Sequence, residues 1–129
     1  MNDRNTDNGL KDLQLWSSLL AATKAAHRHR PLALIVPAND RKRHLGLEPM
    51  VQKIGCAYEV IVENSVVCGR RWSAILTTPG VNAASAWYAE LRFRVVTPGP
   101  IFTPADTEAA LRGRDLAEAM ARATRGALA

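Results

Sequence analysis

Apolar residues near the start of the chain recur every three or four positions, at Leu10, Leu13, Trp16 and Leu20. This spacing is typical of an amphipathic helix whose apolar stripe faces a core. The helix is expected to end before Pro31, because the residue ahead of a proline is disfavoured in the α region. Residues 1–8 are mostly polar and indicate a disordered tail.

A short continuous apolar run follows between two prolines. Residues 32–36 read LALIV and are flanked by Pro31 and Pro37. An apolar run of this length without alternation is typical of a strand that is buried on both faces. The segment therefore predicts one short buried strand.

The centre of the chain has the composition of β-strands. Residues 56–64 and 66–78 are rich in β-branched and aromatic residues and flank Asn64 and Ser65, a pattern that favours a hairpin. A second turn is indicated at Pro79-Gly80, and residues 87–95 then alternate apolar and polar side chains. Together these segments predict an antiparallel meander of three strands.

Two further helices are predicted from residues that are typical of helix termini. Pro49 and Gly55 bracket a short helical segment, since proline suits the first position of a helix and glycine the position after its last. Thr103, Pro104 and Asp106 have the order of a helix cap, a first residue and a first-turn acid. The C-terminal helix is expected to be divided at Gly113 and to bury a stripe of Leu116, Met120, Ala123 and Ala127.

The fold class predicted from these patterns is α+β. It comprises an N-terminal amphipathic helix, one short buried strand, an antiparallel three-stranded meander and a C-terminal helix packed on one sheet face. A length of 129 residues with 47% hydrophobic residues suits a single domain. Residues 9–129 are expected to form it, and the sequence does not predict an oligomeric state.

Positive charge is concentrated in one segment. Residues 24–44 hold six of the 17 lysines and arginines but one of the 12 acidic residues, so they carry all of the net charge of +5. The other bases and acids of the chain balance. An anionic partner is therefore expected to meet this segment, although net charge alone does not predict a fold or a reaction.

The sequence gives no sign of a membrane span or a cofactor. Its longest uncharged run, residues 72–89, is interrupted by polar residues, proline and glycine, which a bilayer-spanning helix would not tolerate. Residues 1–9 lack the apolar stretch of a secretory signal, so a cytoplasmic location is expected. In that compartment Cys56 and Cys68 would stay reduced. No glycine-rich nucleotide-binding motif is found, and we expect no cofactor.

Catalytic and metal-binding motifs are also missing from the sequence. His27, His29 and His44 lie among lysines and arginines that would repel a divalent cation, and no cysteine or carboxylate stands at a zinc-binding spacing. No serine or cysteine lies in a recognisable nucleophile motif. We therefore expect no enzyme and no metal site.

Binding is the function that the sequence favours. The expectation is a small, non-enzymatic binding protein that contacts a nucleic acid, or a complex that binds nucleic acid, through residues 24–44. Arginine predominates among the bases, and its guanidinium makes forked contacts to phosphate. An aromatic side chain beside arginines on the open sheet face would stack on a base. The candidate contact residues are Lys24, Arg28, Arg30, Arg41, Lys42, Arg43, Tyr88, Arg92 and Arg94.

Two other interpretations stay open at this stage. Charges beside an apolar strand commonly act as gatekeepers against aggregation, and Arg92 and Arg94 beside Glu90 are also what a solvated strand face would carry. The alternative function is docking onto an acidic protein surface, as an inhibitor or adaptor of a phage or mobile element. Anti-CRISPR proteins are one such group, and this alternative follows from the small size of the chain and its lack of motifs.

Overall fold

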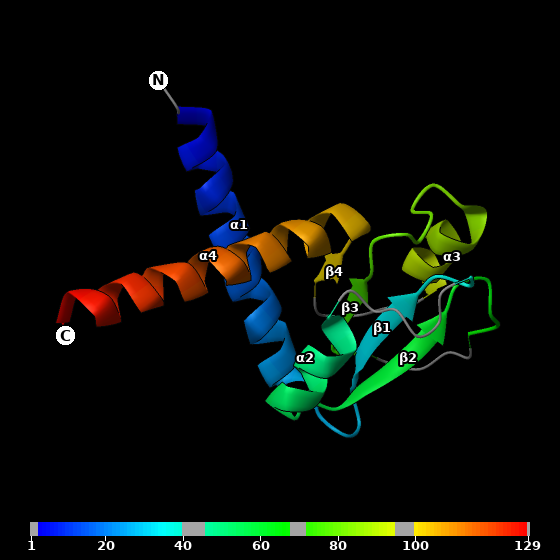
Figure 1. The fold of residues 1–129 in the computed structure, drawn as a ribbon. Coiled ribbons are helices and arrows are strands. Elements are labelled where there is room, and N and C mark those ends of the chain that lie inside the picture. Colours follow the sequence, from blue (N-terminus) through cyan, green and yellow to red (C-terminus); the bar gives the residue numbers. More distant parts are fainter. Residues whose placement is uncertain (1–2, 40–45, 68–71, 95–99, 129) are drawn as a thin grey trace.

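The computed structural model describes residues 3–39, 46–67, 72–94 and 100–128 (Figure 1). Its α1 already begins within the segment expected as a polar tail. The elements follow in the order α1 (Asp3–Ala25), β1 (Leu32–Val36), α2 (Leu47–Ile54), β2 (Tyr58–Val62), β3 (Ala74–Thr77), α3 (Ala86–Arg94), β4 (Ile101–Phe102) and α4 (Pro104–Leu128).

The strands form one parallel sheet in the order β2-β1-β3-β4. The predicted mixture of helices and strands is confirmed, but the predicted antiparallel meander is wrong. β1 lies inside the sheet, where Leu34 is paired with Val60 of β2 and Leu76 of β3. Every residue of β1 is buried, which confirms the prediction of a strand covered on both faces.

The predicted hairpin fails at its second arm, although its turn is present. Asn64 adopts a left-handed φ of 69°, and the Ser65 amide donates to the Val62 carbonyl at 3.1 Å. The chain then crosses to the other side of β1 instead of returning along β2. A hairpin would leave an edge of the wholly apolar β1 unpaired, whereas strands on both sides satisfy its backbone and cover its side chains.

The predicted third strand is a helix. Residues 86–94 form α3, which begins after Ser85, whose Oγ accepts a hydrogen bond from the Tyr88 amide at 3.1 Å. Tyr88 and Leu91 are buried and lie three positions apart, which is the spacing of one helix face. The alternation in this segment was therefore coincidental, because the helical pair and the serine cap determine its structure.

Helices cover both faces of the sheet in three layers. Figure 1 shows the sheet with α2 and the crossed pair of α1 and α4 to one side and α3 apart from them. On the first face the core comprises Leu19, Ala22, Leu32, Leu34, Val36, Leu47, Val51, Ala74, Leu76, Phe102 and Ala110. On the α3 face it comprises Ala33, Ile35, Ile61, Trp72, Ile75, Val81, Tyr88 and Leu91.

α4 confirms its predicted start but not its predicted break. The Thr103 Oγ1 accepts from the Asp106 amide, and the Asp106 carboxylate accepts from the Thr103 amide, each at 3.2 Å. This reciprocal pair is a capping box. The helix continues through Gly113 without interruption, because that glycine lies where α4 crosses α1: a Cβ there would collide with the Asp12 carbonyl. The predicted burial of its C-terminal apolar stripe is wrong, because Met120 is 54% exposed.

The short helix α2 ends as predicted. Gly55 follows it with a left-handed φ of 79°, and its amide donates to carbonyls of the last turn. The helix begins at Leu47, two residues before Pro49. Among the described residues, no helix is long and apolar enough to span a bilayer.

Candidate functional site

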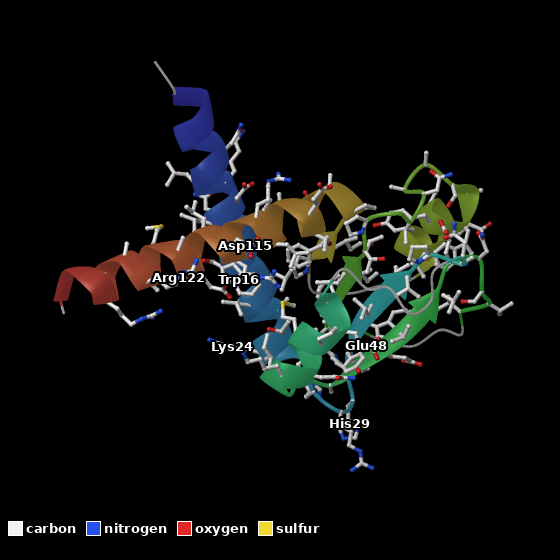
Figure 2. All side chains as sticks on the ribbon, in the orientation of Figure 1. Trp16, Lys24, His29, Glu48, Asp115 and Arg122 are labelled. Carbon is white, nitrogen blue, oxygen red and sulfur yellow. The ribbon has the colours of Figure 1, made fainter. Side chains whose placement is uncertain are left out.

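Residues 24–30, here called the basic turn, connect α1 to β1. α1 ends at Ala25, after which His27 and Arg30 exchange two backbone hydrogen bonds of 3.1 and 3.0 Å. The His29 amide donates to His27 Nδ1 at 3.3 Å. These bonds fix a tight turn in which Arg28 and His29 occupy the tip, and Figure 2 shows His29 extending from the body there.

The cations of the basic turn face solvent. Lys24 and Arg28 are exposed, and Arg30 is partly exposed. The salt bridges found within the described residues join Arg112 and Arg114 to carboxylates, and none of these bridges includes a cation of the basic turn. Within the described part of the chain, the turn therefore presents cations without an ion-pair partner on a constrained backbone.

Lys53 is another exposed base, which was not selected from the sequence. It lies in the last turn of α2. The Leu32 amide donates to the Ala57 carbonyl at 2.9 Å, which holds the segment after α2 beside the start of β1. In the sequence, Lys53 is recognisable only as a basic residue in the last turn of a helix. A cation at that position stabilises the helix by its interaction with the helix dipole, so it does not by itself indicate a binding site.

The helix dipole accounts for some of these charges but not all of them. Lys24 and Lys53 both lie in last turns of helices, where a cation is favourable without any ligand. Arg28 and Arg30 lie outside the helices, so this explanation does not reach them. Their side chains are the strongest candidates for contact with an anion.

The structure does not describe the second predicted cluster. Arg41, Lys42 and Arg43 lie outside the described residues. In the sequence they follow β1, whereas the basic turn precedes it, so the whole strand separates the two clusters along the chain.

The third group of predicted contact residues does not form a stacking surface on the sheet. Tyr88 is 1% exposed, and its hydroxyl is 2.8 Å from the Thr77 Oγ1 in the core between α3 and β3. It cannot stack on a base from that position, so this prediction is wrong. Arg92 and Arg94 lie on α3 instead of a strand, and the structure does not describe their side chains.

The Tyr88 hydroxyl is expected to contribute to stability and not to binding. Tyr88→Phe would leave the buried Thr77 hydroxyl without this partner, so the free energy of unfolding should fall by about 1–3 kcal/mol. Urea denaturation measures this loss. Tyr58→Phe is the matched control, because the Tyr58 hydroxyl receives an exposed bond from Gln52 and should cost less than about 0.5 kcal/mol. Equal losses in the two variants would contradict the assignment.

The carboxyl edge of the sheet contains a polar connection that the sequence did not reveal. The two carboxylate oxygens of Glu63 accept from the Ala38 amide at 3.5 Å and from the Asn82 amide at 2.8 Å. Glu63 thereby joins the segments that follow β1, β2 and β3. Parallel sheets commonly bind ligands at this edge, but here a carboxylate of the chain itself occupies these two amides.

A groove of about 440 Å³ runs along the outer strand β2. Among the described residues its lining is mostly apolar and includes no lysine or arginine. The lining residues are Glu59, Val60, Ile61, Val62, Ser65, Val66, Val67 and Trp72.

Metal binding and thiol chemistry receive no support from the described part of the chain. Within residues 3–39, 46–67, 72–94 and 100–128, no three histidine, cysteine or acidic side chains gather as a metal site. Burial raises the pKa of the Cys56 thiol. A thiol with a raised pKa stays protonated at neutral pH and is a poor nucleophile.

The fold and this surface define a three-layer protein with a parallel sheet and a protruding basic turn. Comparison with known proteins adds no relative to this description: no family model, no curated protein and no solved structure matches the chain.

Proposed function

We propose that the chain is a non-enzymatic binding protein that contacts nucleic-acid phosphates through the basic turn, with Arg28 and Arg30 as the central contacts. The observation that carries this proposal is that both arginines are accessible, lie outside the helices, and take part in none of the salt bridges of the described residues. The sequence-derived residues Arg41, Lys42 and Arg43 belong to the same proposal.

The shape of the turn supports binding to a phosphate chain. The paired backbone bonds of His27 and Arg30 limit the motion of the residues between them, so less entropy is lost when the side chains engage a ligand. Guanidinium groups also bind phosphate oxygens in pairs of hydrogen bonds. A short protruding turn with two arginines and an adjacent lysine fits the backbone of a nucleic acid better than an enclosed small-molecule site.

The expected result concerns the salt dependence of binding. In Arg28→Ala/Arg30→Ala, the loss of two phosphate contacts should reduce the log–log slope of affinity against salt by about 1.8 for duplex DNA and by about 1.4 for a single strand. Fluorescence anisotropy with a labelled oligonucleotide across a salt series measures the slope. The same titration on Arg41→Ala/Lys42→Ala/Arg43→Ala should give a reduction of about 2.7 on duplex DNA.

A matched control separates local contacts from overall charge. Arg112→Ala/Arg114→Ala removes the same charge, but these arginines already pair with Asp12, Glu108 and Asp115. Its slope should stay close to that of the parent. If Arg28→Ala/Arg30→Ala changes the slope no more than this control, the basic turn is not the contact surface.

The competing partner class is an acidic protein surface, and a capture experiment distinguishes it. A partner that is recovered with the immobilised chain after complete nuclease digestion, and lost in Arg28→Ala/Arg30→Ala, would replace the nucleic-acid proposal with protein docking. Loss of all captured material on nuclease digestion supports the proposal.

A further inference from the structure

The basic turn contains two histidines whose rings differ in their hydrogen bonds. The Nδ1 of His27 accepts from the His29 amide at 3.3 Å, so this nitrogen is unprotonated and the ring proton of His27 lies on Nε2. Neither ring nitrogen of His29 is hydrogen-bonded to another described residue. A second proton on His27 would break a bond of the turn, whereas a proton on His29 would break none.

His29 lies where a phosphate chain would meet the turn. It occupies the tip with Arg28, is exposed, and extends from the body in Figure 2. Arg30 follows it directly in the chain. A phosphate that is bound by either arginine would therefore lie beside the His29 ring.

Cations predominate around His29 in the free protein. Lys24, Arg28 and Arg30 lie on the turn itself, and the His27 ring is 6.3 Å from the His29 ring between centroids. A proton on His29 therefore adds a like charge to three cations, and an anion bound there offsets that repulsion. The charged and titratable groups of the adjoining elements α2 and β2 are Glu48, Lys53, Tyr58 and Glu59.

A bound phosphate chain favours the protonated form of His29. Its negative charges attract the imidazolium, so the complex binds more protons than the two free partners. By linkage, the affinity then rises as the pH falls through the range in which histidine titrates, from about pH 8 to about pH 5. We propose that His29 is a proton-linked phosphate contact and that acidification strengthens nucleic-acid binding by the basic turn, an inference that rests on the function proposed above.

Fluorescence anisotropy with a labelled oligothymidylate tests this contact, because thymine and phosphodiesters do not titrate in this range. Every variant, and the parent used for comparison, carries His44→Gln, so that the two histidines of the turn are the only ones left. From about pH 8 to about pH 5.5, one added contact should steepen the log–log slope of affinity against salt by about 0.7. At about 0.1 M salt this corresponds to about fivefold tighter binding.

Two substitutions in the turn assign the response. His29→Gln should abolish it, whereas His27→Asn should retain it, because the asparagine oxygen accepts the His29 amide in place of Nδ1. Both histidines are exposed, so circular dichroism should show parental helix content. A parent without a pH response, or a response that persists in His29→Gln, would overturn the proposal. Other groups that titrate in this range, such as the α-amino group, would respond equally in the parent and in His29→Gln.

The salt slopes at about pH 8, where histidine is neutral, separate this inference from the proposed function. If Arg28→Ala/Arg30→Ala reduces the slope at that pH but the parent shows no pH response, only the proton-linked contact is overturned. If Arg28→Ala/Arg30→Ala instead matches the Arg112→Ala/Arg114→Ala control, the proposed contact surface and the role of His29 are both overturned.

Discussion

Gly113→Ala is expected to lower the free energy of unfolding by about 1–3 kcal/mol, as overpacking does in a tight interface. Gly113 is buried where α4 crosses α1, and an added Cβ would collide with the carbonyl carbon and oxygen of Asp12 and would lie 3.0 Å from the Leu13 amide nitrogen. These neighbours are backbone atoms of a helix and cannot move aside as a flexible side chain would. The two helices would have to separate, so urea denaturation should show the loss.

The same helix provides an opposite control. Gly126 is exposed near the end of α4, and a Cβ added to it would have no other heavy atom of the fold within 4 Å. Gly126→Ala should therefore stabilise the protein, by at most about 1 kcal/mol, because alanine restricts the unfolded chain and favours a helix. The two glycine-to-alanine substitutions should thus change the free energy of unfolding in opposite directions. A neutral or stabilising Gly113→Ala would mean that the helices do not cross closely at this point.

Leu34→Ala is expected to cost about 2–5 kcal/mol of the free energy of unfolding. Leu34 is fully buried at the middle of β1 and packs in the core beneath α1, α2 and α4. Its strand is paired on both sides, so the surrounding structure has little freedom to collapse into the space left by the leucine. Chemical denaturation followed by circular dichroism measures the change.

Val66→Ala is the control for this substitution. Val66 is 95% exposed, so shortening it should change the free energy of unfolding by less than about 0.5 kcal/mol. A loss below about 1 kcal/mol in Leu34→Ala would contradict the central place of β1 in the sheet.

Local signals in the sequence predicted the elements that local physics determines. The apolar run LALIV identified a strand buried on both faces, and Gly55 identified the end of α2. Thr103 and Asp106 identified the start of α4, because a capping box needs residues only three positions apart. These predictions required no knowledge of distant partners.

Strand direction could not be obtained in the same way. The turn at Asn64 forms as a hairpin turn would. However, β2 and β3 each pair with β1 and not with each other, because β1 requires a neighbouring strand on each side. Likewise, residues 87–95 alternate as a strand would, while Ser85 and the buried pair of Tyr88 and Leu91 favour a helix. In both places contacts with the rest of the fold outweighed the local pattern.

The candidate site was predicted in part. Charge counting selected Lys24, Arg28 and Arg30, and the structure places them on an accessible turn. Tyr88 was selected as a stacking residue on the assumption of an open sheet face, which α3 in fact covers. Lys53 was missed because a basic residue in the last turn of a helix is already explained by the helix dipole.

The position of β1 also constrains how the protein is made. Both of its neighbours come later in the chain, and the last residues of β3 are about 40 residues beyond the end of β1. At a synthesis rate of about 5–20 residues per second, the most apolar strand leaves the ribosome roughly 2–8 s before its second partner exists. Charged residues beside an apolar strand commonly limit its association with other chains. We expect the basic residues around β1 to act in this way during that interval, whatever the mature protein binds.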